Sequence, residues 1–264
     1  MPITPLFCGV DVGASSTKVV LLDAARQCRA RVVNPSGVDY AATCRASLEE
    51  AIAEAGIGPR DVARTVATGY GRNNVGFANL THTEIHCHAV GCVHHASRPI
   101  TIVDIGGQDN KVIRVDTRGR HVHFHMNRKC AAGTGAFLEE IALRLGLAVG
   151  DLNALAAQAA TGVRLSSFCT VFAKTEILTH LREGAPVAAI VRGAFSSVVN
   201  RVVEMDPLEG EVFMSGGVAA HNPVIVEILS QRLGRQVLVP PHPQFAGALG
   251  AALLASRGVD QMRA

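Results

Sequence analysis

The sequence has few features suited to binding nucleic acid. It has no tryptophan, only two tyrosines and an aromatic content of 4%, so it lacks the side chains on which bases of single strands stack. The net charge is +3, and the lysines and arginines are scattered, without the basic stretch that a phosphate backbone attracts. We therefore expect no nucleic-acid partner.

Long apolar runs are absent as well. No stretch reaches the roughly 18 apolar residues that suggest a membrane-spanning helix. The N-terminal sequence MPITPLFCGVDVG does not join a basic segment to a long apolar one, as a secretory signal does. We therefore expect a cytoplasmic protein with no membrane partner.

The cysteines do not form a disulfide framework. There are seven of them, an odd number at irregular spacings, and in a reducing cytosol such residues are usually buried or bind metal. The chain of 264 residues is 48% hydrophobic and 18% charged. This is enough for one large ordered domain or two small ones.

Two segments of the sequence resemble each other. In GVDVGASSTKVVLLD (9–23) and IVDIGGQDNKVIRVD (102–116), an Asp is followed two residues later by Gly and seven residues later by Lys. Apolar, mostly β-branched residues flank each polar turn, which predicts two hairpins with the same turn chemistry. Asp104 stands 93 residues after Asp11, so the repeat predicts two halves built on one plan.

Helical patterns follow both hairpins. They cover residues 39–56, 134–146, 169–184 and 186–204. The last pattern places five apolar residues on one helical face, namely Val187, Val191, Ala194, Val198 and Val202. Residues 211–234 predict a strand, a Gly-Gly turn and a helix. We expect an α/β protein with halves at 1–98 and 99–264, and a C-terminal helix that packs back on the first half.

Both hairpin turns carry residues suited to phosphate and Mg²⁺. The candidate phosphate-binding residues are Gly13, Ser15, Ser16, Thr17 and Lys18 in the first turn, and Gly106 and Gly107 in the second. Asp11 and Asp104 end equivalent strands, and Mg²⁺ prefers one or two carboxylates with water and phosphate oxygens. One D-x-G sequence would be explained by hairpin closure alone. Two copies with matched lysines, and a third Gly-Gly turn at 216–217, favour a nucleotide site.

The nucleotide site is of neither common glycine-rich type. The sequence lacks G-x-x-x-x-G-K-[ST], and its first turn lacks G-x-G-x-x-G. Segments 9–18, 104–111 and 214–219 instead resemble the superfamily of acetate and sugar kinases, heat-shock chaperone ATPases and actin. This resemblance implies two duplicated actin-like (ribonuclease H-like) halves around an ATP cleft.

Two cysteines precede predicted helices. Cys130 lies in NRKCAAGTGAFLEE and Cys169 in SSFCTVFAKTE, and helix N-termini stabilise thiolates. A lone cysteine is usually a buried apolar residue. The alternative is an iron–sulfur cluster, in which a [4Fe–4S] centre needs four cysteines. Two copies of this pair across a twofold axis would supply them.

A closer resemblance favours the cluster. The segments NRKCAAGTGAFLEE, CTVFAKTEI, VATGYGRNNV, TEIHCHAVG and VDIGGQDNKVI together resemble the ATP-dependent activators of 2-hydroxyacyl-CoA dehydratases and the related ATPase subunits of benzoyl-CoA reductases, over residues 9–255. The resemblance implies a homodimer bridged by one [4Fe–4S] cluster on Cys130 and Cys169 of each subunit. It also implies a ferredoxin or flavodoxin donor, and ATP-driven electron transfer to the dehydratase or reductase.

The resemblance also suggests roles in the nucleotide site. Asp11 and Asp104 would hold Mg²⁺ or its water shell, and Gln108 would orient an attacking water. Gly216, Gly217 and Gln244 would border adenosine, although small residues near Gln244 equally suit close helix packing. Arg128 and Lys174 stand where the family is expected to be acidic.

Rival interpretations remain. A small-molecule kinase of the same superfamily would need an acidic base and would not use the cysteine pair, while a chaperone-like ATPase would need a peptide-binding domain. The segment HTEIHCHAVGCVHH (82–95) and the sequence HVHFH (121–125) are rich in possible metal ligands. A helix with partly buried histidines and a polar sheet face, respectively, are favoured over metal sites.

Overall fold

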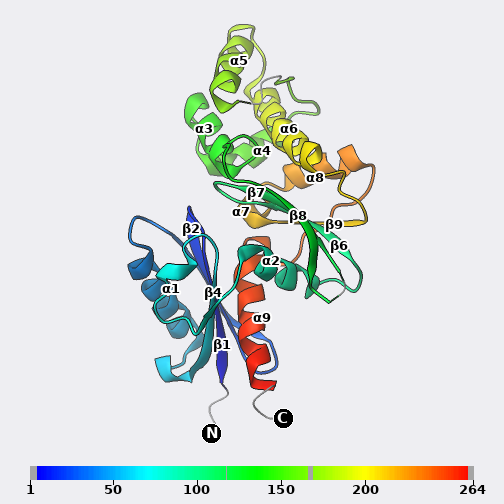
Figure 1. The fold of residues 1–264 in the computed structure, drawn as a ribbon. Coiled ribbons are helices and arrows are strands. Elements are labelled where there is room, and N and C mark those ends of the chain that lie inside the picture. Colours follow the sequence, from blue (N-terminus) through cyan, green and yellow to red (C-terminus); the bar gives the residue numbers. More distant parts are fainter. Residues whose placement is uncertain (1–4, 117, 166–168, 261–264) are drawn as a thin grey trace. The chain divides into compact units, whose positions relative to one another are not determined.

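The structure, a computed structural model, describes residues 5–116, 118–165 and 169–260 and is drawn as a ribbon in Figure 1. The described residues form two compact units. The first draws on Met1–Pro99, Val115–Val122 and Phe245–Ala264. The second draws on Ile100–Arg114 and His123–Gln244.

The first sheet has five strands in the order β3-β2-β1-β4-β5. Its strands are β1 (Leu6–Val12), β2 (Ser16–Leu22), β3 (Cys28–Pro35), β4 (Val62–Thr68) and β5 (Leu80–Thr81). Strand β1 pairs antiparallel with β2 and parallel with β4. It lies at the centre of the sheet, and all seven of its residues are buried, which explains its nearly continuous apolar sequence.

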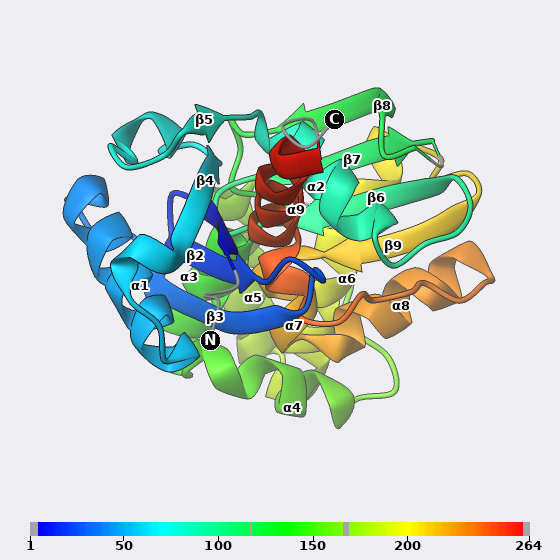
Figure 2. The ribbon, with the colours of Figure 1, turned by 90° about the horizontal axis from the view of Figure 1, so that it is seen from below.

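Three α-helices lie in the same unit as this sheet, namely α1 (Tyr40–Ala55), α2 (Glu84–Val93) and α9 (Ala246–Asp260). Helix α1 begins where the Asp39 side chain accepts from Ala42 N, and it ends at Gly56 with φ 66°. Helix α9 packs on β1 and β4, and it lies beside α2, as Figure 2 shows. This packing requires glycine, because a Cβ on Gly250 would overlap the carbonyl oxygen of Cys87.

The second sheet has four strands in the order β8-β7-β6-β9. Its strands are β6 (Ile100–Ile105), β7 (Asn110–Val115), β8 (His121–Asn127) and β9 (Glu211–Ser215). The helices of this unit are α3 (Gly135–Leu145), α4 (Leu152–Ala157), α5 (Thr170–Arg182), α6 (Val187–Met205), α7 (Gly216–His221) and α8 (Pro223–Leu233).

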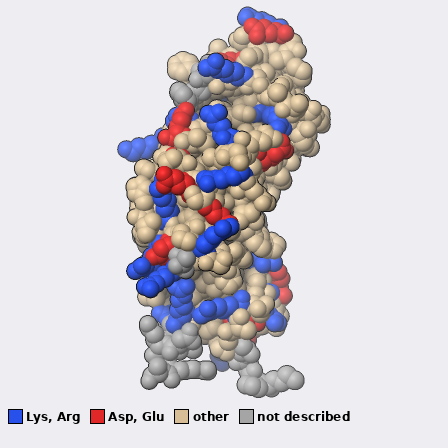
Figure 3. Space-filling model, turned by 90° about the vertical axis from the view of Figure 1, so that its right-hand side faces the viewer, with Lys and Arg blue, Asp and Glu red and all other residues tan. Residues whose placement is uncertain are grey.

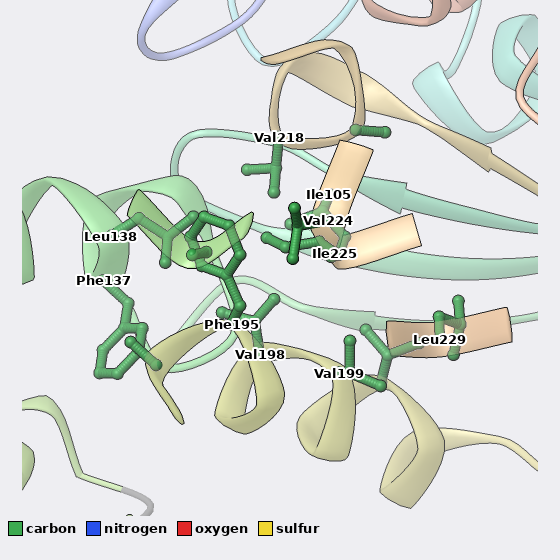
Figure 4. Close-up of a cluster of buried hydrophobic side chains, with 14 of the residues drawn as sticks. Ile105, Phe137, Leu138, Phe195, Val198, Val199, Val218, Val224, Ile225 and Leu229 are labelled. Carbon is green, nitrogen blue, oxygen red and sulfur yellow. The ribbon is translucent and has the colours of Figure 1, made fainter. Parts of the chain in front are cut away.

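Helix α6 organises the core of the second unit. Its buried Phe195, Val198 and Val199 share a cluster with Ile225 and Leu229 of α8 (Figure 4). Burial of each such side chain contributes about 1.5–3 kcal/mol. The predicted apolar face is confirmed at its other four positions, while Val187, in the first turn, is 37% exposed.

The structure confirms both predicted hairpins and the four predicted helices, with shifts of one to a few residues at their ends. One prediction is corrected. Residues 216–217 are not a turn but the first residues of α7. Helix α7 then ends before Asn222, because Pro223, the first residue of α8, disfavours helical geometry at the residue before it.

None of the helices in the described ranges is long and apolar enough to cross a bilayer. On the face shown in Figure 3, acidic side chains lie among the basic ones. The segment 82–95 contains helix α2 (Glu84–Val93), with Cys87, His88 and Cys92 buried, as favoured from the sequence.

Candidate functional site

The first hairpin presents a tight turn beside a buried carboxylate. Asp11 lies opposite Lys18 in the β1–β2 register, and the turn closes where Gly13 N donates to Ser16 O over 3.1 Å. Lys18 Nζ donates to the same Ser16 oxygen, also over 3.1 Å. Ser15 is exposed. The turn therefore combines an ammonium group and small residues that let an anion approach the backbone.

Thr17 is held differently from its neighbours. Its side chain is fully buried, and its hydroxyl lies 3.0 Å from Ser36 Oγ. Ser36 in turn donates to Gly13 O over 2.7 Å, and Ser36 N donates to Ser15 O. Thr17 and Ser36 thus fix the shape of the turn, and the Thr17 hydroxyl is engaged within the first unit.

Asp11 is surrounded by glycines and an imidazole. The carboxylate is 6% exposed. A Cβ on Gly69 would lie 2.5 Å from Asp11 Oδ1, and one on Gly247 would lie 2.7 Å from Asp11 Oδ2 and 3.0 Å from His88 Nε2. Asp11 and His88 therefore border the same glycine. The sequence shows His88 only as part of a histidine-rich segment, so its place beside Asp11 was missed.

The second hairpin contains a buried ion pair. Lys111 Nζ lies 3.0 Å from Asp104 Oδ2 and 2.9 Å from Asp109 Oδ1. The other oxygen of Asp104 accepts from Ser215 Oγ over 2.8 Å. Asp104 and Lys111 are 1% and 3% exposed. The carboxylate is thus fixed by two donors, and its partner Ser215 was not among the predicted site residues.

The structure brings the predicted Gly216 and Gly217 to this hairpin. Strand β9 pairs parallel with β6 and places Ser215 opposite Asp104, so α7 begins directly after that contact. Gly216 has φ 93°, and a Cβ there would overlap the oxygen of Ile105, whereas Gly217 has open space around it. The close approach of the start of α7 to β6 therefore requires glycine at position 216, whereas Gly217 is accessible to a ligand.

Gln108 and Gln244 lie in short turns. Gln108, at the tip of the second hairpin, is exposed. Gln244 is half-buried in a 3₁₀ turn, Pro243–Phe245, before α9. In α9 itself the helix-packing alternative is confirmed, because Ala246 and Gly250 lie against Gly91 of α2.

The second hairpin is hydrogen-bonded to the start of α3. Gly135 N donates to Gly106 O over 2.9 Å, and Ala136 N donates to Gly107 O over 2.7 Å. Asn110 Nδ2 donates to Gly133 O over 2.8 Å. Two N–H groups that a helix normally leaves unpaired are thus bonded to the Gly106-Gly107 carbonyls. The glycine-rich turn before α3 is consequently held against the second hairpin by these bonds.

Cys130 lies in the loop that enters α3. Its backbone N–H donates to Asn127 Oδ1 over 3.2 Å, and its carbonyl accepts from Asn127 Nδ2 over 3.0 Å. Cys169 is exposed and is the N-cap residue of α5, where its carbonyl accepts from Ala173 N. Each predicted cluster ligand therefore precedes a helix of the second unit. Residues 166–168, next to Cys169, lie outside the described residues.

Most other cysteines are unsuited to ligand chemistry. Cys8, Cys44, Cys87 and Cys92 are buried. Burial raises the pKa of Cys8 and Cys87 to about 12 and that of Cys44 to about 11, so these thiols stay protonated at neutral pH. Only Cys28, an exposed residue of the first unit, compares with Cys169 in accessibility.

The family model of the BadF/BadG/BcrA/BcrD ATPase family matches residues 8–255. The chain belongs to this ATPase family. The activator of lactoyl-CoA dehydratase from Anaerotignum propionicum is a 41% identical relative over 250 residues, which cover 94% of this chain and 96% of the relative.

Two solved structures are similar to this chain over nearly its whole length. The (R)-2-hydroxyglutaryl-CoA dehydratase component A of Acidaminococcus fermentans is 37% identical, covers 97% of this chain and all of its own, and has a TM-score of 0.92. The activator of 2-hydroxyisocaproyl-CoA dehydratase from Clostridium difficile with bound ADPNP is 36% identical, covers 98% and 97%, and has a TM-score of 0.90. The predicted α/β class and actin-like ATPase fold are confirmed.

The two residues expected to be acidic in the ATPase family differ in their surroundings. Arg128 is exposed. Lys174 of α5 forms an ion pair with Glu140 of α3, with Nζ and Oε1 2.6 Å apart. The positive charge of Lys174 is therefore balanced within the second unit, and the pair joins the two helices that follow Cys130 and Cys169.

Proposed function

We propose that this ATPase activates a 2-hydroxyacyl-CoA dehydratase by supplying it with a low-potential electron. Three relatives named as activators of such dehydratases are about 40% identical along nearly the whole chain. The observation that carries the proposal is the set of hydrogen bonds between Gly106-Gly107 and the first residues of α3. These bonds connect a candidate phosphate-binding hairpin to the loop of Cys130.

The hairpins are proposed to bind the phosphates of ATP. Backbone N–H groups in turns of small residues suit anions, and Lys18 adds a positive charge. The proposed phosphate ligands are Gly13, Ser15, Ser16, Lys18, Gly106 and Gly107, with Thr17 fixing the turn that carries the first four. The proposed adenosine neighbours are Gly216, Gly217 and Gln244. Asp11 and Asp104 would carry Mg²⁺ or its water shell. The exposed Gln108 would orient the attacking water.

Cys130 and Cys169 are proposed to hold a [4Fe–4S] cluster. Their chemistry fits, because both precede helices and neither is buried like Cys8, Cys44, Cys87 and Cys92. One chain supplies two of the four thiolates that such a cluster generally requires, so a homodimer would complete the set. When bound, the cluster supplies one-electron redox chemistry at low potential.

Coupling between nucleotide and cysteines follows from the bonds already described. A phosphate that reorients the Gly106-Gly107 backbone changes the acceptors of Gly135 N and Ala136 N, so the entry to α3 must adjust. Because the Lys174–Glu140 ion pair joins α5 to α3, a movement of α3 would also move α5. We propose that ATP binding and hydrolysis reposition both cysteine loops in this way while the electron passes from ferredoxin or flavodoxin to the dehydratase.

The test is metal analysis of anaerobically purified protein. Wild type should carry about four irons per homodimer, and Cys130→Ala or Cys169→Ala should reduce this to background while ATP binding persists. Cys28→Ala, at an accessible cysteine of the other unit, is the matched control and should keep its iron. Wild-type protein that binds ATP without iron and phosphorylates a small molecule would support the kinase alternative instead.

The client is tested separately. The loaded protein with ATP and reduced ferredoxin or flavodoxin should restore activity to an inactive 2-hydroxyacyl-CoA dehydratase. Activation of benzoyl-CoA reductase alone would reassign the client within the same chemistry. Activation of neither, by protein that holds iron and hydrolyses ATP, would overturn the electron-transfer part of the proposal.

A further inference from the structure

A group of three possible metal ligands lies on β8, away from the residues assigned above. Side chains two residues apart point to the same face of a strand, and His123 Nε2 lies 2.9 Å from His125 Nε2. His125 Nε2 lies 3.9 Å from Asp206 Oδ2. One ligand atom from each of the three residues lies within 4.8 Å of the others.

We propose that His123, His125 and Asp206 form a binding site for a first-row divalent transition metal such as Zn²⁺. Bonds of about 2.0–2.1 Å in a tetrahedral site place ligand atoms roughly 3.3–3.4 Å apart. The separations of 2.9 and 3.9 Å lie on either side of that value, and the third pair of ligand atoms lies within 4.8 Å, so side-chain rotations would complete the geometry. A water would complete the coordination, as in sites with three protein ligands.

Asp206 is fixed for this role by its own partners. It is 3% exposed, and its Oδ1 accepts from Leu208 N over 2.7 Å and from Arg114 Nη2 over 3.0 Å. These bonds engage one oxygen and leave Oδ2 on the side of His125. Hydrogen bonds of this kind orient the ligands of metal sites.

The charge and the backbone around Asp206 also suit a cation. Arg114 lies 3.1 Å from Glu209 as well, so the guanidinium is shared by two carboxylates and does not neutralise Asp206 alone. Leu208 is buried with φ 54°, and its carbonyl accepts from Arg235. The turn that carries Asp206 is therefore held by the rest of the second unit, and a bound ion would join β8 to the connection between α6 and β9.

The site stands apart from the proposed function, and it differs from the polar sheet face favoured by the sequence. HVHFH places three imidazoles, those of His121, His123 and His125, on one face of the strand, but it does not show the carboxylate, because Asp206 is 81 residues beyond His125 in the chain. Two neighbouring surface imidazoles alone need no metal. A buried, oriented carboxylate beside them is the feature that points to one.

Equilibrium dialysis of the untagged full-length protein against Zn²⁺ tests the site. Because other zinc-binding groups are common to all variants, the difference between variants isolates it. His123→Gln and His125→Gln should each remove one zinc per chain or weaken its binding at least tenfold. The control is His94→Gln/His95→Gln, another close imidazole pair, with ring centroids 5.1 Å apart, which should bind like wild type. Equal zinc binding by wild type and both single variants, or an equal loss in the control, would overturn the proposal.

Asp206→Asn distinguishes a three-ligand site from a histidine pair. It should weaken zinc binding at least tenfold, and zinc should raise the melting temperature of wild type but not of His125→Gln. Full zinc affinity in folded Asp206→Asn would overturn the assignment of the carboxylate. The histidine variants keep the proposal testable if Asp206→Asn does not fold, because both histidines are exposed.

Discussion

In the first hairpin Lys18 donates to a backbone carbonyl of the turn, whereas in the second Lys111 binds the carboxylates of Asp104 and Asp109. The two lysines occupy equivalent positions in the repeat, seven residues after Asp11 and Asp104. The ammonium group therefore stays near the candidate phosphate position in one copy and neutralises the buried carboxylate in the other. Matched residues thus carry different electrostatic roles.

The two copies agree in backbone beyond the hairpins. Asp11 lies opposite Thr68 on β4 and Asp104 lies opposite Ser215 on β9. Each of these strands is followed by a glycine in the left-handed region, Gly69 with φ 87° and Gly216 with φ 93°.

The turns that follow β2 and β7 also match. Asp23 and Asp116 both accept from the backbone N–H groups two and four residues further along the chain. The repeat thus preserves strand order and turn shape, while the side-chain bonds around each buried carboxylate differ.

Breaking the buried ion pair should have the largest effect. Lys111→Met leaves Asp104 charged and buried, so we expect a loss of about 3–5 kcal/mol in the free energy of unfolding. Lys18→Met removes one hydrogen bond from a half-buried lysine and should cost about 1 kcal/mol. Urea denaturation measures both, and equal unfolding midpoints for the two variants would contradict the contrast between the copies.

The equivalent glycines should respond alike. Gly216→Ala and Gly69→Ala each add strain of about 1–3 kcal/mol for the left-handed backbone and a similar cost for overlap with neighbouring atoms. Gly217→Ala is the matched control and should leave stability unchanged, because its added methyl group meets open space. Thermal unfolding measures the series. A Gly216→Ala protein as stable as Gly217→Ala would show that the first position tolerates a side chain.

Removing the hydroxyl of Ser215 should cost less. Ser215→Ala leaves Asp104 with one donor fewer, and hydrogen bonds to charged groups contribute about 1.5–3 kcal/mol. Ser215→Thr introduces the residue type found at the equivalent position of the first copy and keeps the hydroxyl, so it should recover most of the loss. If urea denaturation gave equal stability for Ala, Thr and wild type, the Ser215–Asp104 bond would be energetically unimportant.

The smallest expected effect is at the turn after β7. The backbone N–H of Arg120, followed by its side chain and the backbone N–H of Arg118, lowers the pKa of Asp116 below its ordinary value of 3.8. A lowered folded-state pKa stabilises the turn above the ordinary value, and this stabilisation is lost as the pH falls through the folded-state value. The carboxyl signal of Asp116 in an NMR titration should therefore have its midpoint below pH 3.8. A midpoint at or above 3.8 would contradict the assigned bonds.

The sequence was sufficient for features set by local pattern. The Asp-x-Gly…Lys repeat predicted both hairpins, because turn residues and alternating apolar residues act over a few positions. The break at Asn222 was also visible in principle, since Pro223 follows it. Contacts across long separations were not visible, such as Thr17 with Ser36 or Ser215 with Asp104. Those pairs form only when the sheets assemble, and no periodicity in the sequence specifies them.

The carbonyls of Gly106 and Gly107 bind α3, and each belongs to a peptide plane whose N–H lies on the opposite side, at Gly107 and Gln108. A planar amide cannot turn one end without turning the other. If a phosphate oxygen drew those N–H groups toward itself, the carbonyls that accept from Gly135 and Ala136 would tilt with them. The two peptide planes would then rotate as rigid units when a terminal phosphate binds or leaves. This rotation would shift the first residues of α3, which follow the loop that carries Cys130.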